Sequence, residues 1–469
     1  MLPRWAQGAG SSGTANVEAL VVDSVRYGAL DIAVTDRFVR VWDDNGSGAT
    51  LNGSFFNPYI SDSMYQQGWR VLGGVGHGGR EEINGRYGTV LVRGVSATDP
   101  ETAPPVRFEL IWNDAGSGAK KDGSVWRMIP PAGYVALGDV FQLGHGAPDP
   151  RWFACVRRNI GGRSYVREGH IGELIWNDKK SGAKKNVSVW QVRAPQYPSD
   201  PTERLILGAD LYRAVGHHDK PSDTVYVLDL PAAVVKRQPP NPPRLESHAI
   251  PPQETGPITD RVVTVPFTTI TDPGKTLAWQ AANSPFYTLE RRVNYRLVLH
   301  RDNSAGSETP PDSQAVTTGV TTENSQEYSR RTSVTVSASA GISFKGLSAG
   351  VETSATTELG YSTRYSVAQL VSETKTWSLL TPPRKSGALW AARHEIITLR
   401  KDGTDVGGRG GLKFDVDSRV TGEYPPAREA ESAVRVLVDG IEVADDPKDQ
   451  PFGEAESNVP ETPQTALGS

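Results

Sequence analysis

The sequence predicts an all-β protein, in which a threefold pseudo-symmetric, β-prism-like head precedes an elongated, β-rich second part. The chain of 469 residues contains 48 glycines and 34 prolines, which favours many turns and short strands. The first half repeats one aromatic motif three times. The second half contains a long stretch in which apolar and hydroxyl side chains alternate with a period of two, as they do in a strand.

Composition argues against several classes of protein. Lys and Arg number 50 against 54 Asp and Glu, a net charge of −4, so nucleic acid is not an expected partner. Cys155 is the only cysteine, which excludes an internal disulfide framework and a cysteine-based zinc site. No apolar run reaches the roughly 18 residues of a transmembrane helix. Residues 1–21 lack the apolar core of a signal peptide, so we expect release from the producing cell by lysis or a specialised route.

The repeat in the first half centres on Trp42, Trp112 and Trp176, each followed by a turn rich in Asp, Asn, Ser and Gly. A second aromatic residue follows each tryptophan at the same spacing, at Phe56, Trp126 and Trp190. A Leu-Gly pair and a histidine come later in every unit; the histidines are His77, His145 and His217. Units of roughly 60–75 residues with about four short strands each predict three small sheets packed as a β-prism, with a β-trefoil as the alternative.

The turns after the tryptophans have three possible roles. They are tight turns in which Asx side chains bond their own backbone, or a sugar or receptor site, or a calcium site. The candidate receptor-binding residues are Trp42, Asp44, Trp112, Asp114, Trp176 and Asp178. Calcium would use Asp114, Ser117 and Asp122, but Lys179 and Lys180 occupy the third turn, so no metal or other cofactor is expected.

The first half resembles the vacuolar protein sorting 62 family domain over roughly residues 16–231. The resemblance lies in the Trp-x-x-x-Gly-Ser-Gly-Ala repeat, in Pro130 to Asp139 and in Phe38 to Trp42. It implies no catalytic residues. We therefore assign residues 1–235 to a receptor- or glycan-binding head. Residues 236–257 contain seven prolines and predict a semi-rigid linker.

The alternating stretch in the second half predicts a β-hairpin over about 334–359. Its apolar side chains lie on even positions up to Phe344 and on odd positions from Leu347, so both rows share one face and these two residues oppose each other across the turn. The other face is almost entirely Ser and Thr. The apolar row consists of Val334, Val336, Ala338, Ala340, Ile342, Phe344, Leu347, Ala349, Val351, Ala355 and Leu359.

Two interpretations of this hairpin remain. Each arm has about the 9–11 residues that a tilted strand needs to cross a bilayer, with one face for lipid and one for water. The alternative is an ordinary half-buried hairpin of an antiparallel sheet. Ser and Thr make up nearly all of the surface row, where an ordinary soluble surface would carry more Lys and Glu, and this favours membrane insertion.

Residues 258–440 resemble the aerolysin-type pore-forming proteins, in particular the epsilon-toxin and mosquitocidal-toxin branch. The resemblance lies in the hairpin, its Ser/Thr-rich flanks, and the segment from Leu379 to Pro383 that leads to a long strand, Ala388 to Leu399. It implies a pore-forming domain at 258–444 that forms homo-oligomers on a target-cell membrane, in an insecticidal-type toxin that is not an enzyme. The alternative function is a non-lytic carbohydrate-binding or adhesion protein with a β-rich stalk.

The remaining segments carry less information. Residues 445–469 are acidic and poor in apolar side chains, and we expect a disordered tail. No nucleophile elbow, phosphate-binding loop or dinucleotide fingerprint occurs. Cys155 lies in an apolar run, Trp152 to Val156, which is typical of a buried structural thiol.

Overall fold

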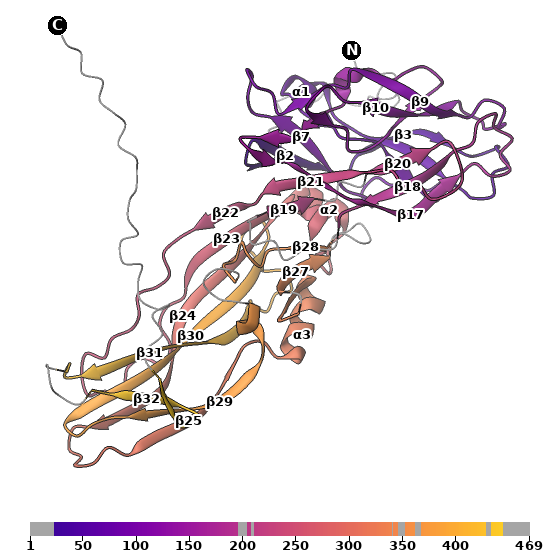
Figure 1. The fold of residues 1–469 in the computed structure, drawn as a ribbon. Coiled ribbons are helices and arrows are strands. Elements are labelled where there is room, and N and C mark those ends of the chain that lie inside the picture. Colours follow the sequence, from indigo (N-terminus) through magenta and orange to yellow (C-terminus); the bar gives the residue numbers. More distant parts are fainter. Residues whose placement is uncertain are drawn as a thin grey trace, which may run out of the picture.

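The structure is a computed structural model that describes residues 23–195, 204–207, 211–339, 341–345, 352–361, 367–427 and 433–443. It is 47% strand and 9% helix, which confirms the all-β prediction. The described α-helices are α1 (Asp62–Gln66), α2 (Leu277–Asn283) and α3 (Thr322–Thr332). Figure 1 shows a head attached to one end of an elongated body. Among the described residues, no helix combines the length and the apolar character that crossing a membrane requires.

Three inner sheets, one from each repeat, give the head its threefold pattern. In each sheet the second strand lies between the first and the third, and the register shifts once or twice along its first strand pair. The head thus confirms the threefold expectation. The strands are β3 (Phe38–Asp43), β4 (Ser54–Pro58) and β6 (Val75–His77); β9 (Arg107–Asn113), β10 (Gly123–Ile129) and β12 (Val140–Leu143); and β17 (His170–Asn177), β18 (Ser188–Arg193) and β20 (Tyr212–Val215).

Each repeat contributes an outer sheet as well, where the sequence predicted one sheet per unit. The chain passes from outer to inner sheet at the Leu-Gly pair, where Gly73 lets two repeats approach: a Cβ there would lie 3.1 Å from Cα of Gly138. The outer strands are β1 (Ser24–Tyr27), β2 (Leu30–Thr35), β5 (Arg70–Val71) and β7 (Thr89–Gly94); β8 (Thr102–Ala103), β11 (Tyr134–Val135) and β13 (Cys155–Arg157); and β16 (Val166–Glu168), β19 (Arg204–Leu207) and β21 (Tyr226–Pro231). A small hairpin, β14 (Asn159–Ile160) and β15 (Arg163–Ser164), follows the second.

Two sheets form the long body. A five-stranded sheet has the order β22 (Ala233–Lys236), β23 (Ile258–Pro266), β24 (Phe286–Asn303), β30 (Lys385–Leu399) and β31 (Leu412–Tyr424). A four-stranded sheet has the order β25 (Pro311–Thr318), β29 (Glu373–Leu380), β32 (Arg435–Val438) and β33 (Ile441–Val443). Their facing side chains, among them Val316, Trp377 and Leu389, form one buried apolar cluster. The expected long strand is present as β30.

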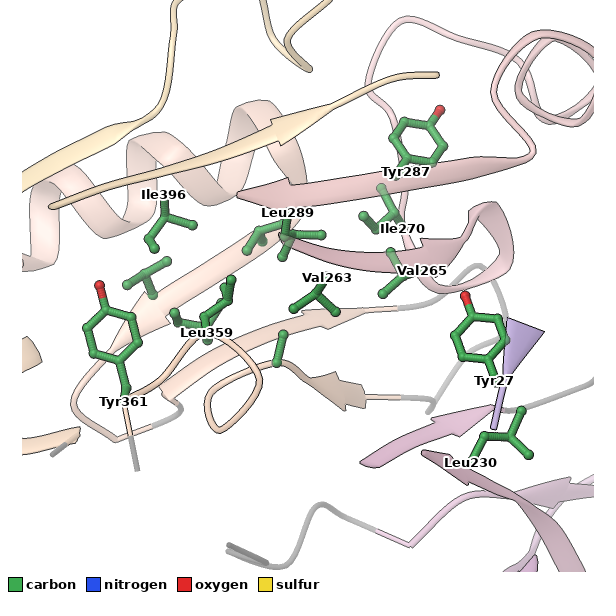
Figure 2. Close-up of a cluster of buried hydrophobic side chains, with 14 of the residues drawn as sticks. Tyr27, Leu230, Val263, Val265, Ile270, Tyr287, Leu289, Leu359, Tyr361 and Ile396 are labelled. Carbon is green, nitrogen blue, oxygen red and sulfur yellow. The ribbon is translucent and has the colours of Figure 1, made fainter. Parts of the chain in front are cut away.

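The head and the body share one apolar core. Tyr27 and Leu230 of the head belong to the same buried cluster as Val263 and Val265 of the body (Figure 2). The Tyr27 hydroxyl also donates a hydrogen bond to the carbonyl oxygen of Thr264, at 3.0 Å. Burial of this apolar surface is the main favourable contribution to joining the two parts.

The proline-rich segment, predicted to be a spacer, instead runs along the body. The amide of Leu297 donates to the carbonyl of Gln253, and the amide of Thr255 donates to Tyr295. Leu245 is buried in the shared core. Proline has no amide hydrogen, so the segment makes these few hydrogen bonds without becoming a further strand. The predicted tail at 445–469 lies outside the described residues.

Candidate functional site

The three turns after the tryptophans, here called the tryptophan loops, are each closed by one aspartate. In each loop the aspartate carboxylate accepts a hydrogen bond of 2.9–3.1 Å from a backbone amide nine residues later. The pairs are Asp44 with Gly53, Asp114 with Gly123, and Asp178 with Val187. Each aspartate also pairs with a side chain of its own repeat: Arg80, His145 and His218, respectively. The three carboxylates are buried and fully engaged in holding their loops.

The three tryptophans meet in the core between the inner sheets. Trp42, Trp112 and Trp176 are each 0% exposed, and their ring centroids lie 5.1–5.6 Å apart in edge-to-face pairs. Such pairs add stability beyond the burial of area. The interpretation of these tryptophans and aspartates as a receptor- or glycan-binding surface is therefore wrong, because none of the six side chains reaches the surface. Their geometry is that of the tight-turn alternative.

The tips of the tryptophan loops are connected in a ring. Three backbone amides donate hydrogen bonds of 2.9–3.0 Å to backbone carbonyls of a neighbouring loop. The donor and acceptor pairs are Lys120 and Asn45, Lys184 and Ala115, and Thr50 and Lys179. Each loop thus donates one main-chain hydrogen bond to a neighbouring repeat. The close approach explains the glycines at the tips: Gly46 has φ of 95°, and a Cβ there would lie 2.8 Å from the carbonyl oxygen of Gly118.

A group of possible metal ligands occurs only in the second repeat of the described chain. One ligand atom from each of Asp114, Asp122 and His145 lies within 4.8 Å of the others. Asp114 already accepts hydrogen bonds from Gly123 and from His145. The calcium alternative also named Ser117, whose hydroxyl accepts the amide of Ala119. Because Asp114 fills the structural role of Asp44 and Asp178, the geometry gives calcium no advantage over a plain turn.

The predicted hairpin is folded differently from the expectation. Its residues form a three-stranded sheet, here called the short-strand sheet, of β26 (Val334–Ser337), β27 (Gly341–Lys345) and β28 (Glu352–Ser354). The expected first arm is broken into β26 and β27, which pair with Val336 opposite Ile342. Gly341 allows the break, because it adopts φ of 60°. The prediction of continuous arms of about 11 residues is therefore wrong for the folded form that the structure describes.

The apolar row of the hairpin faces the body. Val334, Val336, Ile342, Ala355 and Leu359 are at most 1% exposed and belong to the core that joins head and body. Ala338 is half-buried in the turn after β26, and the backbone of Phe344 lies in β27. Ala340, Leu347, Ala349 and Val351 lie outside the described residues.

Aromatic and charged side chains attach this segment to the five-stranded sheet. The Tyr361 hydroxyl lies 2.9 Å from Nδ1 of the buried His394 on β30. The guanidinium of Arg291 on β24 packs over the Tyr361 ring and forms a buried ion pair with Asp260. Figure 2 shows Leu359 and Tyr361 near Leu289 and Ile396. Sequence reasoning missed this contact, because its members are spread over more than 130 residues with no common motif.

Known families match both halves of the chain. Residues 1–220 match the family model of vacuolar protein sorting-associated protein 62, and residues 261–381 match that of insecticidal crystal toxin, P42. The first match confirms the resemblance of the head, and the second supports a toxin-like protein. The assignment to the aerolysin type stays a prediction.

Two solved structures are similar to parts of the chain. One is GNIP1Aa from Chromobacterium piscinae, with 28% identity, 41% of this chain and 34% of that chain covered, and a TM-score of 0.33. The other is Cry35Ab1, with 9% identity, 86% of this chain and 91% of that chain covered, and a TM-score of 0.31. The chain thus spans about a third of the length of the first. No curated protein matches the chain.

Proposed function

We propose that this chain, with its match to an insecticidal toxin family, is a β-pore-forming toxin. The protein leaves the producing cell, binds a receptor on a target-cell membrane and oligomerises there. Each subunit then inserts residues 334–359 as one amphipathic hairpin. The observation that supports this most directly is the register of two strands that the structure already pairs, β25 and β29.

The strands β25 and β29 lead into and out of the short-strand sheet. They pair from Pro311 opposite Leu380 to Thr318 opposite Glu373. Continuing this register inward places Val336 opposite Ala355 and ends at Phe344 opposite Leu347. That is the turn predicted independently from the alternation of apolar residues. With α3 unwound, one continuous ladder would run from β25 and β29 to the tip of an inserted hairpin.

The same register keeps the two faces distinct. Val316 and Thr318 on β25 are buried and have the even numbering of Val334, Val336 and Ile342. Trp377 and Leu379 on β29 are buried and have the odd numbering of Ala355 and Leu359. Because side chains alternate along a strand, the apolar row would continue one face of the pair. That face would contact lipid, and the Ser/Thr row would contact water.

Insertion requires α3, which lies between β25 and β26, to unwind into a strand, and it requires two changes in the short-strand sheet. The break at Gly341 must straighten so that β26 and β27 form one strand. The pairing of β27 with β28, which places Phe344 opposite Thr353, must slip to place it opposite Leu347. This slip is an even number of residues, so it turns no side chain to the opposite face. The strand pairing that would be lost is internal to the short-strand sheet, and the helical hydrogen bonds of α3 would be lost with it.

A disulfide across the break tests this proposal. Thr335 and Ser343 are direct partners on β26 and β27 and are both half-buried. Opposed antiparallel residues have Cα atoms about 4.5–5.5 Å apart, within the range of a disulfide. We expect oxidised Thr335→Cys/Ser343→Cys protein to release no dye from insect midgut membrane vesicles, and reduction to restore release.

The matched control is a disulfide that both forms accommodate. Thr317→Cys/Thr374→Cys joins direct partners on β25 and β29, which stay paired in the inserted hairpin. This variant should release dye whether oxidised or reduced. If oxidised Thr335→Cys/Ser343→Cys protein is as active as the wild type, the segment does not straighten, and if the wild type never causes leakage, pore formation is wrong.

A further inference from the structure

We propose that six lysines at the tips of the tryptophan loops form a docking surface for a membrane rich in anionic lipids. This surface, here called the lysine apex, consists of Lys120, Lys121, Lys179, Lys180, Lys184 and Lys185. The inference deepens the proposed function by naming the partner of the head. It rests on the proposed function in one respect, namely that the protein acts at a target-cell membrane.

The ring of loop contacts brings these lysines together. Lys120 and Lys184 occupy equivalent positions in the second and third repeats, and their amides make the hydrogen bonds that join neighbouring loops. Their side-chain stems pack against the neighbouring loop: a Cβ on Gly46 would lie 3.4 Å from Cγ of Lys120, and one on Gly116 the same distance from Cγ of Lys184. The fold thus holds the side-chain stems of Lys120 and Lys184 against the neighbouring loops.

The lysine apex is a concentration of net positive charge. All six side chains are exposed, and none takes part in an ion pair among the residues that the structure describes. Asp44, Asp114 and Asp178 of the same loops are buried and already paired with Arg80, His145 and His218. Asp122 is exposed beside Lys121, so it offsets one of the six positive charges. The whole chain has a net charge of −4, so this patch opposes the overall sign. Such a patch attracts polyanions over about a Debye length.

The residues that the first repeat contributes beside the lysine apex favour a lipid surface as its partner. The first repeat has Thr50 and Leu51 where both other repeats carry a pair of lysines, and Asn45 and Gly46 where the third repeat carries Lys179 and Lys180. Leu51 is 39% exposed. The lysines lie in the loops that connect β9 with β10 and β17 with β18. Four to eight basic residues beside an exposed apolar residue are typical of a surface that binds anionic lipid.

The first repeat supplies the substitutions for a test. A variant with Lys120→Thr, Lys179→Asn, Lys180→Gly and Lys184→Thr replaces four lysines by residues that the fold already carries at the equivalent positions. Lys180 has φ of 68°, so glycine suits that position. The matched control removes four exposed basic residues elsewhere, by Arg86→Gln, Arg163→Gln, Arg237→Gln and Lys413→Gln. Both variants have the same net charge.

The measurement is sedimentation with vesicles of phosphatidylcholine, with and without phosphatidylserine, at fixed salt. We expect the wild type and the control to bind the anionic vesicles, and the lysine variant to bind roughly fivefold more weakly per lysine removed, several hundred-fold in total. Equal binding of wild type and lysine variant would overturn the proposal. So would binding by the wild type to a sulfated polysaccharide but not to anionic vesicles.

Vesicle binding and dye release separate this inference from the proposed function. Wild type that binds anionic vesicles through the lysine apex but never releases dye supports the docking surface and contradicts pore formation. Wild type that releases dye from vesicles without anionic lipid, with no loss in the lysine variant, supports the pore and contradicts the docking surface. Unfolding temperatures of all variants show whether each one is folded.

Discussion

The tryptophan loops and the short-strand sheet are both rich in Gly and Ser, yet the structure stabilises them in opposite ways. The loops exchange main-chain hydrogen bonds between repeats and enclose three fully buried tryptophans. The short-strand sheet pairs internally, and this segment contacts the body mainly through aliphatic side chains, all smaller than tryptophan. We propose that the short-strand sheet rearranges and the loops do not, although the two regions share the same residue types. The proposed difference rests on where the backbone hydrogen bonds go and on how large the buried side chains are.

The largest expected effect concerns the head. Trp42→Ala should lower the free energy of unfolding by about 3–5 kcal/mol, because it leaves a cavity between three inner sheets. It also removes the indole hydrogen bond to Asp114, which measures 3.1 Å. Denaturant unfolding followed by fluorescence measures the change. The half-buried Trp190, replaced by alanine, is the control and should cost less. Equal losses would contradict a specific role for the buried tryptophan contact.

The intermediate effect concerns the short-strand sheet, where one substitution should lower stability and yet increase activity. Gly341→Val should cost about 1–2 kcal/mol, because a β-branched residue is strained at φ of 60° and its Cβ would meet Thr356. The same residue favours a straight strand. We therefore expect a less stable protein that releases dye faster, measured by denaturation and by leakage.

The control for this variant places the same strain in the head. Gly133 has φ of 82° and no atom within 4 Å of a Cβ built there, so Gly133→Val strains the backbone without a clash. Because it lacks the contact with Thr356, it should lower stability by less than Gly341→Val does, and it should leave the rate of dye release unchanged. If both variants accelerate release equally, global instability rather than the break at Gly341 controls the rate.

The sequence predicted those features that depend on spacing along the chain. The equal spacing after Trp42, Trp112 and Trp176 indicated the threefold head, and the alternation around Val336 indicated strands with one apolar face. The burial of the tryptophans could not be predicted, because an aromatic residue beside a polar turn occurs both in cores and in sugar sites. The break at Gly341 was equally hidden, because a glycine within an alternating pattern is compatible with a straight strand and with a turn.

The features missed by sequence reasoning depend on contacts between distant segments. Tyr361 meets His394 only because the segment folds back onto β30. The lysine apex depends on the ring of loop contacts, although one signal was present in the sequence: lysine follows the tryptophan at the same distance in the second and third repeats, at Lys120 and Lys184. Repeat-by-repeat comparison of charges could have identified this surface.

The smallest expected effect is an absence of reaction at Cys155. This thiol is 0% exposed, and burial raises its pKa to about 12. At pH 8 only about one molecule in ten thousand would carry the reactive thiolate. If only the short-strand sheet rearranges, a thiol reagent should leave Cys155 unmodified while dye is released, and should react with it after denaturation. A Thr335→Cys variant provides the positive control, because its half-buried thiol should become more reactive on membranes. Modification of Cys155 at the rate of dye release would show that the head opens too, and the contrast between a rigid head and a movable sheet would then be wrong.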